Sequence, residues 1–172
     1  MEKSRALHAI VSAGLIAGIL DITSAFVIAE LKGTGSIRML QGIASGLLGA
    51  RSFEGAIATA GLGLVIHFFI AFTAASVFYL GSRRFSFLTR HAVVSGLAYG
   101  IAVYIFMYWI VVPLRFPSVH HSVSRDVTAV IIHMILIGLT IALVVRHFSR
   151  NKCSAVNERS ARFHRESCAG HR

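Results

Sequence analysis

The chain has 172 residues, of which 55% are hydrophobic and 14% charged, and its mean hydropathy is +0.71. Soluble domains carry about 25% charged residues, so this composition excludes an ordinary soluble protein. The formal net charge of +10 could indicate nucleic-acid binding. However, the basic residues flank apolar runs and form no patch interleaved with aromatic residues. We therefore expect no nucleic-acid partner and a lipid bilayer as the principal surroundings.

Four apolar runs exceed the about 18 residues that a membrane-spanning helix needs. They cover residues 7–29, 56–80, 92–114 and 127–145, and the last three contain no Asp, Glu, Lys or Arg. At about 1.5 Å per residue, each run is about as long as the hydrocarbon core is thick. The sequence predicts an all-α fold, an integral membrane four-helix bundle within residues 1–148. A cleaved secretory signal is the alternative for the first run, which is nevertheless longer than a signal core.

The segment between the first two runs, residues 31–55, is too polar to span and too apolar for a free loop. Within residues 36–49 the apolar side chains recur at helical spacing. This pattern predicts a short interfacial or re-entrant helix between helices 1 and 2. At the other end of the chain, residues 149–172 are polar and basic without periodicity, which predicts a mobile cytoplasmic tail. Its two cysteines, Cys153 and Cys168, are expected to be free thiols.

The basic residues predict the orientation of the helices, because cytoplasmic loops carry an excess of Lys and Arg. With the N-terminus in the cytoplasm, twelve of the 17 Lys and Arg residues fall on the cytoplasmic side. The five on the outer side are Lys32, Arg38, Arg51, Arg115 and Arg125. We therefore expect both termini in the cytoplasm, with anionic lipid attracted to the basic cytoplasmic face.

Three ionisable side chains fall inside the predicted helices, namely Asp21, His67 and His133, and Tyr104 is a polar aromatic neighbour. Ionisable groups are costly in a membrane and are functional hypotheses by default. Because successive helices run antiparallel, the depths of these residues can be compared. All four fall within about one helical turn, roughly 5 Å, of the same level. The sequence therefore predicts a polar cluster inside the bundle.

Small residues predict which helix faces turn inward, since membrane helices approach one another closely along them. Such residues share the helix stripes of Asp21 and His67: Gly14, Gly18 and Ala25 for the first, and Ala60, Gly63, Ala71 and Ala74 for the second. Both polar groups should therefore point into the bundle. In the third helix we expect Tyr104 and Tyr108 on one face, with Gly96 and Gly100 in the opposite region.

The cluster admits three interpretations. An aspartate with two histidines is typical of a proton relay or a solute site. The same groups could instead fix helix packing, at about 0.6 kcal/mol for each hydrogen bond. Haem ligation by His67 and His133 is a third interpretation, although a diheme core would need more histidines, and we expect no cofactor.

The outer loop carries a second candidate, His120 and His121 with Asp126. Adjacent histidines do not present the fixed geometry that a metal site requires, so we expect a solvated loop and no metal. The sequence contains no GxSxG, Walker-type glycine loop, CxxC or HExxH. Nothing in it therefore indicates an enzyme.

Several short motifs carry a family resemblance over about residues 10–148. They are GLIAG in the first run, VIHFFIAFTAASVFY around His67, the pair Pro113-Leu114, and His133 early in the fourth run. With these the chain resembles the YagU-type proteins of the bacterial inner membrane and short four-span bacterial proteins with the pattern LGLxxHFxIAFxxAxxFY. The resemblance implies an inner-membrane location and a link to acid stress. It does not account for Asp21.

We therefore expect a small inner-membrane protein that handles protons or a small solute through Asp21, His67, Tyr104 and His133. An oligomer or a larger membrane complex is expected, because four helices enclose little space for a pathway. The rival class is a non-catalytic accessory or assembly subunit whose glycine pairs dock other helices. These pairs are Gly14 with Gly18, Gly96 with Gly100, and Gly42 with Gly46.

Overall fold

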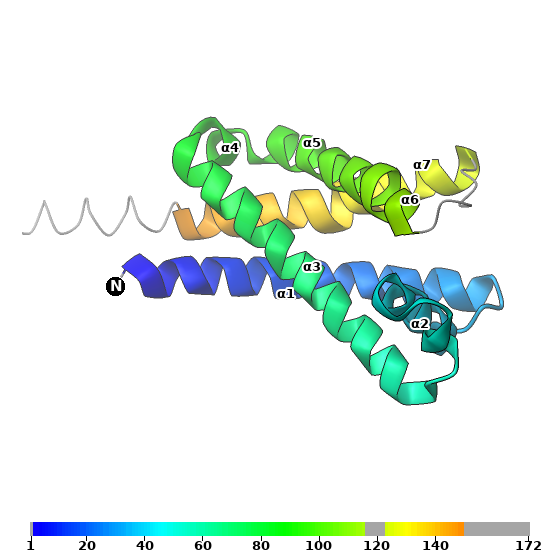
Figure 1. The fold of residues 1–172 in the computed structure, drawn as a ribbon. Coiled ribbons are helices and arrows are strands. Elements are labelled where there is room, and N and C mark those ends of the chain that lie inside the picture. The colour runs from blue at the N-terminus through cyan, green and yellow to red at the C-terminus, as the bar shows by residue number, and fades with distance from the viewer. Residues whose placement is uncertain (1, 116–122, 150–172) are drawn as a thin grey trace, which may run out of the picture.

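The structure, a computed structural model, describes residues 2–115 and 123–149. Within these ranges all regular elements are helices (Figure 1). Four of the helices are long and apolar enough to cross a membrane, and they cover Ser4–Leu31, Ala56–Arg84, Ala92–Val111 and Asp126–Ser149. The prediction of an all-helical chain with four membrane-length helices is confirmed. The tail of residues 150–172, with its two cysteines, and the pair His120 and His121 lie outside the described residues.

The first two long helices are continuous and the last two are composite. The first is α1 (Glu2–Leu31) and the second is α3 (Ala56–Arg84). The third consists of α5 (Ala92–Ile105), the π-helix η2 (Phe106–Val111) and α6 (Val112–Arg115). The fourth consists of α7 (Val123–Ile132), the π-helix η3 (His133–Leu139) and α-helix up to Ser149. Two short helices, α2 (Ser36–Leu48) and α4 (Phe87–Arg90), lie in the connections, and the 3-10 helix η1 (Gly49–Phe53) follows α2.

The helices run alternately up and down (Figure 1). The start of α1, the short helix α4 and the end of the fourth helix lie at one end, here named the N-terminal end. The end of α1, together with α2, α6 and α7, lies at the other, here named the α2 end. Helix α3 crosses α1 obliquely, packs against α2 near its start and comes near α5 beside α4. This alternation is that of an antiparallel helix bundle.

Small residues bring the helices into close contact, as their stripes predict. A Cβ atom added to Gly18 would lie 2.8 Å from the ring of Phe68 on α3, and one on Gly14 would meet Phe72. Between the third and fourth helices the contact is backbone to backbone, because a Cβ on Gly138 would meet the Gly96 carbonyl oxygen. These glycines therefore set the distances between α1 and α3 and between α5 and η3.

The placement of Gly96 and Gly100 opposite the tyrosines was wrong. A Cβ on Gly100 would meet the backbone of His133, and the ring of Tyr104 also contacts His133. All of these residues therefore face η3. The reason is helical geometry, since positions four residues apart lie on the same face of a helix.

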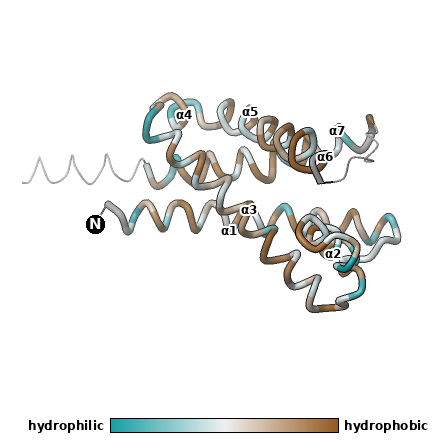
Figure 2. Tube along the Cα trace, in the orientation of Figure 1, coloured by the Kyte–Doolittle hydropathy of each residue, from teal (hydrophilic) through white to brown (hydrophobic). Residues whose placement is uncertain are grey.

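The outward sides of the long helices are apolar. Large side chains such as Leu15, Val65 and Phe69 are exposed within the long helices, and so is Trp109 in η2. Figure 2 shows hydrophobic residues along these helices, with hydrophilic residues mainly toward the two ends. Exposed apolar surface on this scale is unusual for a soluble protein and fits contact with lipid or with other helices.

Helix α2 is fixed to the ends of its neighbours. The Glu30 carboxylate accepts hydrogen bonds from the Ser36 backbone N–H (2.9 Å) and hydroxyl (2.7 Å), at the first residue of α2. The amide of Gln41 donates to the Ala56 carbonyl oxygen (2.9 Å), and Gly63 of α3 lies against the Leu40 backbone. The segment therefore packs on α3 as an ordered helix.

A matched pair of glycine substitutions tests the backbone contact between the third and fourth helices. We expect Gly138→Ala to lower the free energy of unfolding by about 1–3 kcal/mol, because the added methyl group meets backbone that cannot rotate away. Gly61→Ala, on an open face of α3 with nothing within 4 Å, should leave stability unchanged or raise it, since alanine favours a helix. Thermal unfolding of the two purified variants measures the difference. Equal melting temperatures would contradict the backbone contact.

Candidate functional site

Asp21 lies in α1 among apolar residues, in the half of the helix nearer the α2 end. Its side chain is 17% exposed and that of His67 on α3 is 12% exposed. The His67 Nδ1 atom lies 4.0 Å from the Asp21 Oδ2 atom. This distance is within electrostatic contact but longer than a direct hydrogen bond. One bridging water would connect the two atoms.

The backbone of α1 determines which nitrogen of His67 faces Asp21. The Nε2 atom lies 3.0 Å from the carbonyl oxygen of Gly18. A carbonyl oxygen only accepts, so Nε2 carries the hydrogen and donates it. In neutral His67 the Nδ1 atom then presents a lone pair to Asp21. Gly18 makes this approach possible, because any larger side chain there would strike Phe68.

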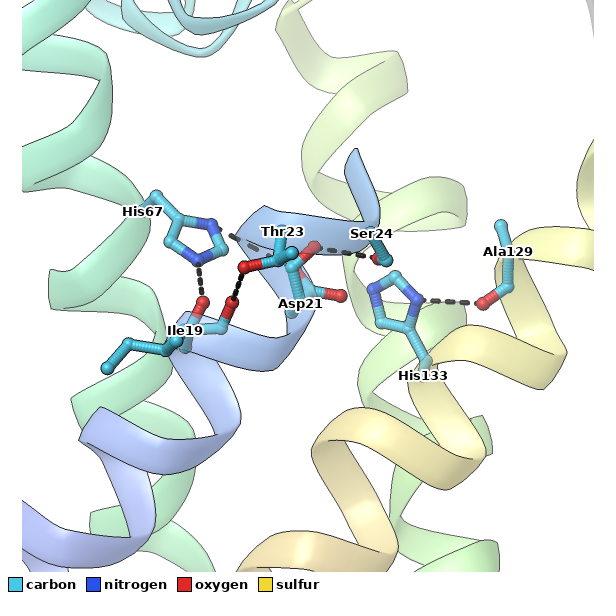
Figure 3. A network of polar contacts seen from close by, with 8 residues as sticks. Ile19, Asp21, Thr23, Ser24, His67, Ala129 and His133 are labelled. Atoms are coloured by element: carbon cyan, nitrogen blue, oxygen red, sulfur yellow. Dashed lines mark hydrogen bonds and ion pairs between the residues drawn. The ribbon is translucent and has the colours of Figure 1, made fainter. Parts of the chain in front are cut away.

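His133, the first residue of η3, is fixed in the complementary way. Its Nδ1 atom lies 2.8 Å from the Ala129 carbonyl oxygen, one turn earlier in the same helix. Nδ1 is therefore the donor, and in the neutral ring Nε2 carries the lone pair. Figure 3 shows Asp21 between the two rings, with the second nitrogen of His133 toward it. The carboxylate interacts electrostatically with both histidines.

The hydroxyl groups nearest to Asp21 donate to the backbone and not to its carboxylate. The Ser24 hydroxyl donates to the backbone carbonyl oxygen of Asp21 (2.7 Å), and the Thr23 hydroxyl donates to that of Ile19 (2.7 Å). Both hydroxyls are thus used by the backbone of α1 (Figure 3). The polar neighbours of the Asp21 carboxylate that can exchange protons with it are therefore His67 and His133.

Two tyrosines surround His133. The rings of Tyr104 and Tyr108 stack with centroids 4.9 Å apart. Each meets the His133 ring edge to face, at 5.9 Å for Tyr104 and 5.7 Å for Tyr108. Tyr108 lies within η2 and His133 begins η3. Single π-helical turns occur frequently at functional sites, and here two of them meet at one histidine.

The Tyr104 hydroxyl is an orphan group, meaning a buried polar group that has no hydrogen-bond partner among the described residues. The residue is 4% exposed, and its hydroxyl makes no hydrogen bond of good geometry within the described chain. It interacts at longer range with the side chains of Trp109 and Asp126. A buried hydroxyl without a partner is costly, and such groups call for a specific explanation.

The geometry limits the protonation states of the cluster. A carboxylate that faces two imidazole lone pairs has three acceptors and no hydrogen between them, and it carries a negative charge in low dielectric. One added proton, on Asp21 or on either imidazole, removes the net charge and supplies a donor. A second proton makes the cluster positive. The cluster therefore offers three positions, one on each side chain, at which an added proton can be held.

The four predicted site residues thus lie in one neighbourhood, with the Asp21 and His67 side chains 4.0 Å apart and the ring of Tyr104 in contact with that of His133. Sequence reasoning did not find the two backbone carbonyls, of Gly18 and Ala129, that fix the imidazoles. A carbonyl belongs to every residue, so no residue pattern could have identified them. Nothing in the sequence indicated that Trp109 interacts with the Tyr104 hydroxyl.

The same geometry bears on a haem. Two axial histidines must point their nitrogens at one iron from opposite sides of the macrocycle. Here Asp21 lies between the rings and the His67 Nε2 atom donates to Gly18, so the residues as arranged do not fit a haem. Within residues 2–115 and 123–149, no group of three His, Cys, Asp or Glu side chains could hold a metal ion.

Comparisons with protein-family models, with curated proteins and with solved structures found no match to this chain.

Proposed function

We propose that this chain is a small multi-pass protein of a bacterial inner membrane whose cluster of Asp21, His67 and His133 gives it a proton-linked or small-solute-linked role. The observation that carries the proposal is the Asp21 carboxylate, held in an apolar helix beside two imidazoles. An acid with two histidines inside a membrane is typical of a proton relay or a solute site.

Membrane insertion is supported by length and by surface. The four long helices have mean hydropathies of 1.8 to 2.6 over their most apolar 18 residues. Large apolar side chains project from them outward. In lipid every backbone hydrogen bond must be satisfied within the chain, as it is in a helix. We place the four helices across the bilayer.

Charge supports the direction of insertion. Arg5, Arg83, Arg84, Arg90 and Arg146 lie at the N-terminal end of the bundle. That end therefore belongs in the cytoplasm, where it meets anionic lipid. The α2 end then faces outward. Helix α2 would lie in the outer interface, with the Arg38 guanidinium over the ring of Phe53 at 5.1 Å.

The alternative role is that of an accessory subunit, for which glycine faces would dock partner helices. Two of the three predicted glycine pairs are occupied within the chain, Gly14 with Gly18 by Phe72 and Phe68, and Gly96 with Gly100 by η3. A Cβ atom added to Gly42 on α2 would meet nothing within 4 Å. An accessory role would therefore use the face of α2 that carries Gly42.

Reporter fusions test the orientation. Fusions within residues 81–91 and after Lys152 should show cytoplasmic activity, and a fusion near Ser118 should show external activity. The reason is the excess of basic residues on the cytoplasmic side. A periplasmic signal from the fusion after Lys152 would contradict the four-span topology.

Substitutions in the cluster test the role. In proteoliposomes, Asp21→Asn, His67→Gln and His133→Gln should each abolish pH-dependent flux or proton binding, because each removes one of the three coupled acceptors. His91→Gln is the matched control, since this histidine is exposed at the start of α5. It should leave the pH dependence unchanged.

A structural role for the cluster would have another signature. The three substitutions would then lower the melting temperature or the assembly state, and the wild-type protein would show no pH-dependent step for them to remove. Expression and detergent-extracted folding of each variant are therefore measured alongside the flux.

A further inference from the structure

The polar groups around Asp21 are distributed unequally toward the two ends of the bundle. Toward the α2 end, the next polar groups are His133, the buried Tyr104 hydroxyl, and Asp126 in the first turn of α7. Asp126 lies near the start of the fourth helix, at the α2 end (Figure 1). A series of titratable or hydroxyl-bearing side chains thus leads from that end to the cluster.

Toward the N-terminal end the interior is mainly apolar, with Ser95 of α5 as a buried polar side chain. All buried residues of the core cluster between Asp21 and that end are hydrocarbon side chains: Ala13, Ala17, Ala75, Phe78, Ala92, Ile141, Ala142 and Val145. The nearby Tyr99 hydroxyl donates to the Ala74 carbonyl oxygen at 2.8 Å. The hydrocarbon side chains of this cluster cannot carry a proton, and the Tyr99 hydroxyl is bound to the backbone.

We propose that protons reach Asp21 and its two histidines from the α2 end only, past Asp126 and Tyr104, while the apolar core closes the other end. This inference rests on the proposed proton-linked function and adds its sidedness. It also explains the orphan hydroxyl, because Tyr104 lies where a proton coming from Asp126 would need a polar group.

The fixed tautomer of His133 allows the transfer without rotation of the ring. A proton that has come from water at the α2 end past Asp126 and Tyr104 adds to the free Nε2 atom and forms an imidazolium, while Nδ1 keeps its bond to Ala129. The Nε2 proton then passes to an oxygen of the Asp21 carboxylate. His133 returns to its original tautomer, and one proton has moved from water to Asp21.

The other charged groups around the cluster do not offer a competing route. Among the described residues, α3 contributes His67, η3 contributes His133, and α5 with η2 contributes Tyr104 and Tyr108. Helix α2 also packs against α1, but its basic residue Arg38 is exposed and lies over Phe53. The titratable neighbours of Asp21 are therefore all on the route or directly beside it.

The single tryptophan of the chain, Trp109, provides a reporter for this route. Its indole interacts with the Tyr104 hydroxyl, so a change in charge at the cluster alters its fluorescence. The full-length protein is reconstituted into liposomes, and vesicles with the tail outward are separated by a tag on the C-terminal tail. These vesicles expose the N-terminal end, and the remaining vesicles expose the α2 end.

A rapid pH step is then applied to the outer solution of each population. We expect a fast change in Trp109 fluorescence only in vesicles that expose the α2 end, and its loss in Asp21→Asn. Tyr104→Phe keeps the ring contacts with His133 and removes the hydroxyl. It should slow the response roughly fivefold, because the transition state for proton transfer would lose about one hydrogen bond. Tyr99→Phe is the matched control in the apolar half and should leave the rate unchanged.

The other outcomes separate the two proposals. A fast response from both populations, from the N-terminal end alone, or with no effect of Tyr104→Phe would overturn the one-sided route and leave the proton-linked function standing. A wild-type signal that Asp21→Asn does not alter, or no signal in either population, would overturn the proton-linked function and the route together.

Discussion

A carboxylate in the apolar middle of a helix is the constraint on which the rest of this structure depends. An isolated ionised Asp21 would be prohibitively costly in low dielectric, so the carboxylate must meet a partner or take up a proton. The partners are two imidazoles from different helices, α3 and η3. The backbone fixes both of them, through the carbonyl oxygens of Gly18 and Ala129. The positions of three helices are thus tied to one charge.

Close helix packing is what allows those contacts to form. His67 reaches the Gly18 carbonyl because α1 presents a glycine to α3, and His133 meets the tyrosines because Gly100 lets α5 lie on the backbone of η3. Small residues serve this purpose in membrane helices. The same glycines that determine the distances between the helices therefore also determine the geometry of the polar cluster.

Much of this could be predicted from the sequence, and the parts that could not have physical reasons. Run length and hydropathy suffice for the four helices, and the antiparallel order of the helices places Asp21, His67 and His133 at similar depth. The helices extend beyond the apolar runs, as at Arg84, because a helix continues into polar sequence until a residue ends it. The face of Gly96 was misjudged, although residues spaced four apart, such as Gly96, Gly100 and Tyr104, lie on the same face of a helix.

The tautomers of the histidines could not be predicted. They depend on which backbone carbonyl each ring meets, and this follows from the crossing of α1 with α3 and from the local path of the π-helix η3. Neither the crossing angle nor a π-helical turn leaves a residue signature as clear as hydrophobic periodicity. For this reason the sequence could indicate which residues share a proton but not which atoms exchange it.

Nitrogen NMR of the protein in lipid bilayers, labelled with ¹⁵N at histidine, tests this arrangement most directly. His67→Gln and His133→Gln assign the two intramembrane signals. At neutral pH we predict that neutral His67 carries its hydrogen on Nε2 and neutral His133 on Nδ1, and that both rings are never charged together while the cluster holds one added proton. The same tautomer in both rings, or two imidazolium signals at neutral pH, would contradict a single proton shared around Asp21.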